Sequence, residues 1–255
     1  MRRNFMNVEY GLKHGEWDRI HSLGSPIFKL RKELVLPRLP AETEKGISVL
    51  DAGCGTGIYT LEMLRRGFRV TSFDVSEYAV KKLFEMTPED WKPRLRTYVC
   101  DTEHFPAEEK FDFILLSEVL EHVKNDVKTL SDLALIMKPS GRVLITLPFD
   151  PGLFSPHDIS AGHFRRYTLE GAKHICSEAG LRVTDSFVYG FPFLYFYYRF
   201  KLRFVRKIPF ENSGAAVRTG IGRIFNFFFD ILLSADRIFL NTGKGVGIVL
   251  LCQKK

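Results

Sequence analysis

The segment DAGCGTG, residues 51–57, follows a short apolar run at 47–50 and precedes a stretch with helical spacing at 58–66. Glycines at a strand-to-helix junction let the backbone turn tightly and approach a ligand closely. The dinucleotide motif GxGxxG is not met, because Ile58 stands where its third glycine would be. An acid two residues before the first glycine suits a cationic amino group better than a pyrophosphate. The segment predicts a ligand-binding turn, with a ligand-free tight turn as the alternative.

Segments of strand and helix character alternate on both sides of this turn. Apolar runs predict strands at 47–51, 68–73, 98–100, 111–116, 142–147, 181–189 and 246–252. Helical spacing or capping residues predict helices at 58–66, 76–84, 130–137 and 169–179. This alternation is typical of an α/β domain with a doubly wound, mostly parallel sheet.

An acidic residue follows each of the first three predicted strands. Asp74 comes 23 residues after Asp51, where a doubly wound fold places the carboxylate that binds ribose hydroxyls. Asp101 follows the third strand, where it can accept a hydrogen bond from an adenine amino group. Each acid taken alone is better explained as a helix cap or a solvated charge. Together, at the sheet edge where such folds bind ligands, they predict a nucleoside-containing ligand.

Five sequence blocks occur in the order of a known family. They are VLDAGCGTG (49–57), FDVS (73–76), CDTEHF (100–105), FDFILLSEVLEHV (111–123) and MKPSGRVLITLP (137–148). On these blocks, about residues 45–190 resemble the class I S-adenosylmethionine-dependent methyltransferases, especially the small-molecule branch that includes ubiquinone-biosynthesis enzymes. The resemblance implies a Rossmann-like sheet of seven strands with an antiparallel last strand. It also implies methyl transfer from S-adenosylmethionine, which leaves S-adenosylhomocysteine.

The resemblance further implies where the cofactor binds. The glycine turn would hold the methionine part, the acid after the second strand would take the ribose hydroxyls, and the residues after the third strand would flank the adenine. The end of the fourth strand would lie beside the cofactor. The residues predicted to contact the cofactor are Asp51, Gly53, Cys54, Gly55, Asp74, Val75, Asp101, Thr102, Ser117 and Glu118.

Histidines near the predicted edge are candidate catalytic bases. The methyl group of a sulfonium is already activated, so the protein mainly aligns the acceptor and excludes water. An oxygen nucleophile usually also needs a base, and histidine is the residue best suited to this at neutral pH. The candidates are His122, His157 and His163.

The motif E-x-x-E-H at 118–122 raises the question of a metal. Residues three and four apart share a helix face. In some ubiquinone-type relatives a similar trio holds a divalent cation, so Glu118, Glu121 and His122 are candidate ligands. The alternative is an acid at a helix start with a packed histidine, and the metal dependence stays open.

The loop HDISAGHFRRYT, residues 157–168, is too polar for a core segment. In the resembled fold it faces the methyl acceptor, and similar residues occur in methyltransferases of cell-surface polysaccharide and glycolipid loci. Asp158, Arg165, Arg166 and Tyr167 are the predicted acceptor contacts. An arginine can clamp a carboxylate or phosphate. We expect one arginine to face the acceptor and the other to be structural, with a pair to Asp158 as one possibility.

The segment between the sixth and last predicted strands is aromatic and basic. Twelve of the 23 phenylalanines fall between positions 187 and 239, and residues 221–240 have helical apolar spacing. Residues 199–255 contain 11 Lys and Arg but only 3 Asp and Glu, within a chain of net charge +7. This composition fits a helical lid over the cofactor, or a surface that meets an anionic membrane or a lipid-linked acceptor.

The whole sequence predicts one core with additions. The expected parts are an N-terminal helical cap (1–45), the cofactor-binding core (46–190), an aromatic and basic helical insertion or lid (191–245) and a final core strand (246–255). A composition of 45% hydrophobic and 26% charged residues excludes a disordered or collagen-like chain. The four scattered cysteines predict free thiols, and no apolar run predicts a signal peptide or membrane span. The expected location is the cytoplasm, with peripheral membrane association as an option.

Two other functions are weighed against a small-molecule or lipid- or sugar-linked acceptor. Nucleic-acid methylation is favoured only by the basic charge. Residues 117–120 read SEVL rather than the Asn/Asp-Pro-Pro-aromatic motif of amino-directed base methylation, and no Pro-Cys pair offers a thiolate for cytosine attack. A non-catalytic cofactor-binding module has no need of the polar loop at 157–167.

Overall fold

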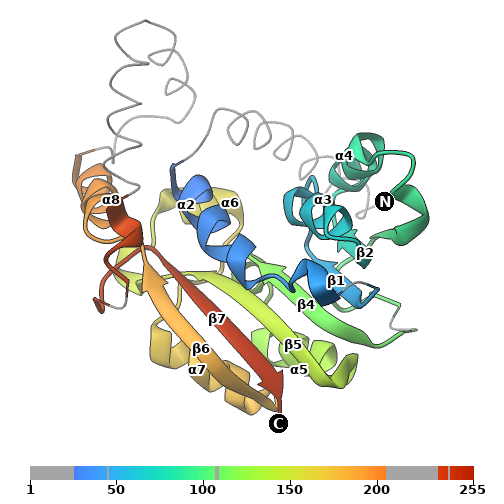
Figure 1. Ribbon diagram of the computed structural model, residues 1–255. Coiled ribbons are helices and arrows are strands. Elements are labelled where there is room, and N and C mark those ends of the chain that lie inside the picture. The colour runs from blue at the N-terminus through green and yellow to red at the C-terminus, as the bar shows by residue number, and fades with distance from the viewer. Residues whose placement is uncertain (1–25, 45, 107–108, 205–234, 241) are drawn as a thin grey trace, which may run out of the picture.

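The structure, a computed structural model, describes residues 26–44, 46–106, 109–204, 235–240 and 242–255 (Figure 1). Its seven-stranded sheet has the order β3-β2-β1-β4-β5-β7-β6. Neighbours among the first five strands are parallel, and β7 is antiparallel to both β5 and β6. The predicted α/β, doubly wound fold with an antiparallel last strand is confirmed. The strands are β1 (Ser48–Ala52), β2 (Arg69–Asp74), β3 (Leu95–Val99), β4 (Phe111–Ser117), β5 (Met137–Pro148), β6 (Leu181–Tyr189) and β7 (Gly247–Lys254).

Helices cover both faces of the sheet, with α2 above it and α5 and α7 below it in Figure 1. The α-helices are α2 (Pro26–Val35), α3 (Ile58–Arg65), α4 (Glu77–Met86), α5 (Asp126–Leu135), α6 (Pro156–Ala161), α7 (Leu169–Glu178) and α8 (Phe193–Phe204). The short 3₁₀ helices are η1 (Leu36–Arg38), η2 (Glu42–Glu44), η3 (Lys92–Arg94), η4 (Leu120–His122), η5 (Pro151–Leu153) and η8 (Ala235–Arg237). Two predicted caps are confirmed, since Ser76 accepts from Ala79 N and Thr168 from Gly171 N.

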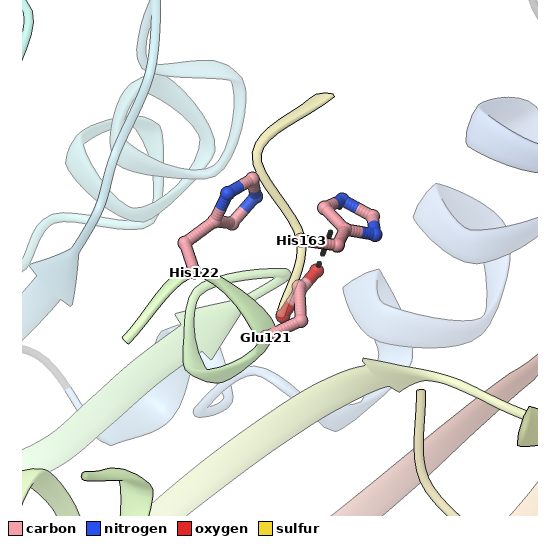
Figure 2. Close-up of side chains that lie close together, drawn as sticks. All are labelled: Glu121, His122 and His163. Carbon is pink, nitrogen blue, oxygen red and sulfur yellow. Dashed lines mark ion pairs between the residues drawn. The ribbon is translucent and has the colours of Figure 1, made fainter. Parts of the chain in front are cut away.

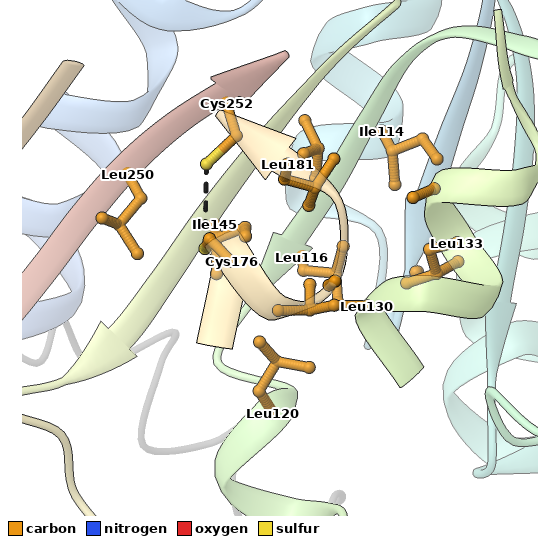
Figure 3. Packing of buried hydrophobic residues seen from close by; sticks show 14 of the residues in the cluster. Ile114, Leu116, Leu120, Leu130, Leu133, Ile145, Cys176, Leu181, Leu250 and Cys252 are labelled. Atoms are coloured by element: carbon orange, nitrogen blue, oxygen red, sulfur yellow. Dashed lines mark hydrogen bonds between the residues drawn. The ribbon is translucent and has the colours of Figure 1, made fainter. Parts of the chain in front are cut away.

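The core is split into two layers because successive strand residues point to opposite faces. On β4, Ile114 and Leu116 pack with α5 and α7 on one face, and Phe113 and Leu115 pack with α2 and α3 on the other. Figure 3 shows part of the first layer, where Cys176 and Cys252 place their Sγ atoms 3.8 Å apart as free thiols. A central strand buried on both faces explains why residues 111–117 read as a nearly continuous apolar run.

Four elements differ from the sequence-based expectation: β3, which begins at Leu95 rather than at residue 98, and α5, β5 and α6. Helix α5 begins after the Asn125 cap and ends at Leu135, whereas the sequence predicts a helix over 130–137. Residues 137–141 instead begin β5, with a register shift opposite Phe111–Phe113 that absorbs the Pro-Ser-Gly sequence. The loop after β5 contains α6, which the sequence does not predict. Its start is a capping box in which Ser155 and Asp158 bond each other's backbone and side-chain groups.

The predicted N-terminal cap and aromatic insertion are described only in part. Within the first, α2 buries Leu30, Leu34 and Val35 in the second core layer. Within the second, α8 follows β6, while residues 205–234, and with them most of the helix predicted at 221–240, lie outside the described residues. Across the described ranges, no helix has the length and apolar content required to cross a membrane.

Candidate active site

The glycine turn packs on one side and is open on the other. Gly53 and Cys54 donate backbone hydrogen bonds to Phe73 O at 2.8 and 2.9 Å, which folds the turn over the end of β2. Gly53 has φ +72°, and a Cβ there would come within 2.6 Å of Val119. Gly55 has φ +52°, but a Cβ there would meet nothing within 4 Å. Glycine adopts the positive φ angles of both positions more easily than any other residue, and Gly55 borders free space.

Asp51 and Asp74 lie at the carboxyl ends of the adjacent strands β1 and β2. Asp51 is buried and accepts from Thr60 Oγ1 at 2.6 Å. Burial raises the pKa of the Asp51 carboxyl to about 7, and the nearby Asp74 charge adds to this rise. Asp74 accepts from Gly55 N at 2.8 Å and from Ser76 N at 2.9 Å. Both carboxylates are thus held beside the glycine turn.

The end of β3 completes this edge. Cys100 N donates to Asp74 O at 3.1 Å, which places the residues after β3 next to those after β2. Asp101 accepts from Glu103 N and His104 N at 3.0 and 2.9 Å and remains half-exposed. The other predicted cofactor residues after the strands, Cys54, Val75 and Thr102, are partly buried. Burial raises the pKa of the Cys54 thiol, which is therefore neutral at physiological pH.

The end of β4 is fastened to two other elements. Ser117 Oγ lies 3.1 Å from Thr146 Oγ1 of β5. Glu118 has φ +59°, a left-handed conformation that is uncommon for a residue with a side chain. Its carboxylate accepts from Thr146 Oγ1 at 3.0 Å and forms an ion pair with Arg31 of α2 at 2.6 Å. Glu118 therefore ties the end of β4 to β5 and to α2.

Glu121, His122 and His163 form a compact group, which Figure 2 shows with the three side chains gathered between η4 and the loop after α6. One potential metal-ligating atom of each lies within 4.8 Å of the others, and the two rings meet edge to face. Glu121 is fully buried, and neither carboxylate oxygen has a hydrogen-bond partner among the described residues. Burial, reinforced by Glu118, raises its pKa well above the usual range. The structure therefore places His163, rather than Glu118, with the other two predicted metal ligands.

Asp158 organises the loop after β5. It is fully buried and accepts from Ser155 N, Ser155 Oγ and Arg166 Nε at 2.7–2.9 Å. His163 Nδ1 lies 3.1 Å from Asp158 Oδ1, the oxygen that also accepts from Arg166, and His163 Nε2 lies 4.0 Å from Glu121 Oε1. Burial opposes ionisation, but the bonds from His163 and Arg166 hold the pKa of the Asp158 carboxyl well below its usual range. Asp158 is therefore a charged anchor for the imidazole of His163.

The remaining predicted acceptor contacts are bound to groups of the chain. Arg165 pairs with Asp126 Oδ2 at 2.8 Å, and Arg166, whose side chain is 7% exposed, pairs with Asp158. Tyr167 is buried and donates to Asp126 or to the Leu120 carbonyl. The sequence predicts one structural arginine and one that faces the acceptor, whereas both guanidiniums here bind carboxylates of the protein. The third candidate base, His157, is half-buried on α6 and is not part of the group around Glu121.

Three side chains near this site were not predicted from the sequence. They are Arg31 of α2, Tyr59 of α3 and Tyr189 at the end of β6. Arg31 and Tyr189 are far in sequence from both the glycine turn and η4. Tyr59 lies just after the turn, but within a partly apolar segment. No local motif marks them, and only the tertiary structure shows that Arg31 reaches Glu118.

A family model described as a methyltransferase domain matches residues 28–186, more than half of the chain. The chain is a class I S-adenosylmethionine-dependent methyltransferase. The sheet order with the antiparallel β7, and the glycine turn followed by acids at successive strand ends, agree with this membership.

Two curated relatives share part of this sequence. The ubiquinone biosynthesis O-methyltransferase of Xanthomonas axonopodis pv. citri (strain 306) is 31% identical over 149 residues, which cover 57% of the chain and 60% of the relative. The same-named protein of Rickettsia akari (strain Hartford) is 26% identical over 137 residues, and the match covers 53% of its length. The methyltransferase thus matches little more than half of these curated relatives.

A solved structure shares the fold at low identity. The Burkholderia thailandensis 1,6-didemethyltoxoflavin-N1-methyltransferase, solved with 1,6-didemethyltoxoflavin and S-adenosylhomocysteine, has a TM-score of 0.63 and 17% identity. The match covers 98% of the methyltransferase and 87% of that chain. At this identity the likeness establishes the fold and leaves the acceptor to be determined.

Proposed function

We propose that the methyltransferase binds S-adenosylmethionine along the carboxyl edge of β1, β2, β3 and β4. From there the methyl group passes in line to a small-molecule acceptor, either free or linked to a lipid or sugar. The observation that carries this proposal is one cluster of side chains, in which Glu121 and His122 follow β4 and Asp158 and His163 follow β5. A buried carboxyl with unsatisfied oxygens beside an anchored imidazole is typical of a reaction site rather than of a core.

The residues along the edge fit the cofactor. The free space at Gly55 admits a close ligand, and the buried Asp51 carboxyl is poised for a cationic amino group. Asp74 would take the ribose hydroxyls, and Asp101 with Thr102 would flank the adenine. Cys54, Val75, Ser117 and Glu118 would line the same path.

His163 is the proposed catalytic base. Asp158 accepts from Nδ1, which fixes the tautomer and leaves Nε2 able to take a proton. In the step proposed here, the acceptor oxygen attacks the methyl carbon and the carbon–sulfur bond breaks. The proton of the acceptor passes to Nε2, and S-adenosylhomocysteine leaves without the positive charge of the sulfonium. His122 and His157 are the alternative bases.

As an alternative to the base role of His163, the side chains of Glu121, His122 and His163 have the chemistry of a divalent-cation site. One carboxylate and two imidazoles suit Zn²⁺ or a similar metal. The unsatisfied oxygens of Glu121 support this fit. A bound cation would act as a Lewis acid that lowers the pKa of an acceptor hydroxyl.

Methyl-labelled S-adenosylmethionine should transfer its label to the small-molecule or lipid fraction of a cell extract. We expect His163→Ala to lower the initial rate by about 10²–10⁴-fold. His174→Ala, an exposed histidine on α7, is the matched control and should leave the rate unchanged. Loss of the reaction on chelation by EDTA would assign the metal role. Label in the RNA fraction alone would favour nucleic-acid methylation, and no label in any fraction would contradict catalysis.

Cofactor affinity should depend on pH through Asp51. With its pKa raised to about 7, the free carboxyl is mostly protonated below that pH, whereas an ammonium ligand favours the carboxylate. Binding then releases a proton, so affinity should fall by about tenfold between pH 8 and pH 6. Isothermal titration at several pH values measures this. Asp51→Asn keeps an oxygen for Thr60 and should flatten the profile, and an unchanged slope in this variant would reject the assignment.

We also propose that the surface around α8 contacts an anionic membrane. Large apolar side chains are exposed there, including Phe196 and Phe200, each about three-fifths exposed. Cations lie over neighbouring rings, with Arg199 5.9 Å from Tyr195 and Lys244 5.9 Å from Phe191. Aromatic side chains beside cations suit the interface of an anionic bilayer and the approach of a lipid-linked acceptor.

Flotation with vesicles of phosphatidylcholine and phosphatidylserine tests this surface. The methyltransferase should float at low salt, and Phe196→Ser with Phe200→Ser should reduce the bound fraction severalfold. Leu135→Ser, which changes an exposed apolar residue of α5, is the matched control and should have no effect. Wild-type protein that stays with the soluble fraction would remove the membrane proposal.

A further inference from the structure

Three buried polar side chains that take no part in the reaction proposed above lie close to Glu118 and Glu121. Arg31 comes from α2, Tyr59 from α3 and Tyr189 from the end of β6. The side chain of Arg31 is 11% exposed, and both tyrosines are buried. Arg31 interacts electrostatically with both tyrosines and both glutamates, so the five side chains share one region of the site.

Each of the three side chains has a hydrogen-bonding atom without a partner among the described residues. These atoms are Nε of Arg31 and the hydroxyl oxygens of Tyr59 and Tyr189. The Tyr59 hydroxyl lies near Ser117 and the Tyr189 hydroxyl near Arg31, but neither contact has hydrogen-bond geometry. A buried donor left unsatisfied destabilises a protein, and native structures rarely leave several together. Burial raises the pKa of both phenols, so each remains an O–H donor at neutral pH. The region therefore offers three donors to a ligand.

The structure holds these donors in place. The ion pair with Glu118 at 2.6 Å fixes Arg31, and Thr146 in turn holds Glu118. The ring of Tyr189 lies against Gly247 of β7, where a Cβ would come within 2.3 Å of the ring. Glycine at this position makes room for the phenol. Donors held in this way can bind a ligand without the entropy cost of ordering them.

We propose that Arg31, Tyr59 and Tyr189 recognise the methyl acceptor. The acceptor presents an anionic oxygen, either of a carboxylate or of a phenolate, to these three donors. This inference rests on the proposed function and names the class of its acceptor. The Nε–H of Arg31 and the two phenol hydroxyls are three donors without an acceptor, and such a set suits an anionic oxygen. Because Glu118 directly precedes η4 and Glu121 lies within it, we expect the recognised oxygen to lie close to the acceptor atom that is methylated.

The affinities of matched anionic and neutral probes test the proposal. Protein saturated with S-adenosylhomocysteine is titrated with benzoate, with 4-nitrophenolate at pH 8 and with the neutral analogue benzyl alcohol, and binding is followed by NMR. We expect at least one of the two anions to bind at least tenfold more tightly than the alcohol, and the two arms distinguish carboxylate from phenolate. Tyr59→Phe and Tyr189→Phe should each weaken the anion by about threefold to tenfold.

A stability measurement separates recognition from a structural role. Removal of an unsatisfied buried hydroxyl should leave the unfolding temperature unchanged or raise it by about 2–4 °C. Tyr78→Phe on the exposed face of α4 is the control for both measurements. The proposal is overturned if no anion preference is seen, or if the phenylalanine variants bind the anion normally. If S-adenosylhomocysteine itself does not bind, that result contradicts the proposed function rather than the proposed recognition of the acceptor.

Discussion

Replacement of Asp74 by alanine should weaken S-adenosylmethionine binding by about 10- to 100-fold in isothermal titration. The carboxylate accepts from Gly55 N and Ser76 N and is the acid proposed to take the ribose hydroxyls. Hydrogen bonds to a charged group contribute about 1.5–3 kcal/mol, and each 1.4 kcal/mol is a tenfold change in affinity. The loss of cofactor affinity should therefore be one of the largest caused by any single substitution at the carboxyl edge of the sheet.

Asp112→Ala is the matched control for this experiment. Asp112 lies at the opposite end of β4, where it accepts from Ser48 N and Lys138 Nζ at 2.8 and 2.7 Å. Its removal should leave cofactor affinity within about twofold, because it is distant from the glycine turn. Asp74→Asn keeps one acceptor oxygen and should give an intermediate loss. Equal affinities for wild type and Asp74→Ala would show that the cofactor does not bind as proposed.

Asp158→Ala should destabilise the protein by about 3–5 kcal/mol in urea unfolding. The change leaves the guanidinium of Arg166 buried without its carboxylate and removes the acceptor for Ser155 and His163. Asp132→Ala breaks the exposed ion pair with Lys128 and should cost less than about 1 kcal/mol. A loss at Asp158 no larger than at Asp132 would refute the anchoring role.

The Asp158 carboxyl should also make the free energy of unfolding fall in acid. Its folded-state pKa lies well below the unfolded value of about 3.9, so its contribution to stability is present above pH 3.9 and is lost as the pH falls below it. In Asp158→Asn this part of the pH dependence should be absent. Urea unfolding at pH 3 and pH 6 provides the comparison.

The main features of the fold could be predicted because they depend on local patterns. The run at 111–116 is apolar at nearly every position, as a strand buried on both faces must be, and Ser76 and Thr168 cap the helices that follow them. The beginning of β5 was missed because the Pro-Ser-Gly sequence at 139–141 normally breaks a helix or strand. In the folded protein a register shift beside β4 accommodates it.

The candidate site was predictable only where the sheet topology places the residues. Asp51 and Asp74 lie at the carboxyl ends of adjacent parallel strands, so their proximity is expected from the strand order. The grouping of His163 with Glu121 depends on how the loop after β5 folds back, which no spacing rule shows. The same holds for Arg31, whose partner Glu118 lies in a distant part of the chain.

A crystal structure of the complex with S-adenosylhomocysteine would show whether the cofactor binds at this edge of the sheet. We expect the ribose hydroxyls to bind Asp74 and the amino group to lie near Asp51. We also expect the sulfur to face the region between His163 and Arg31. A ligand bound elsewhere, or one whose sulfur points away from Glu121 and His163, would contradict the proposed active site.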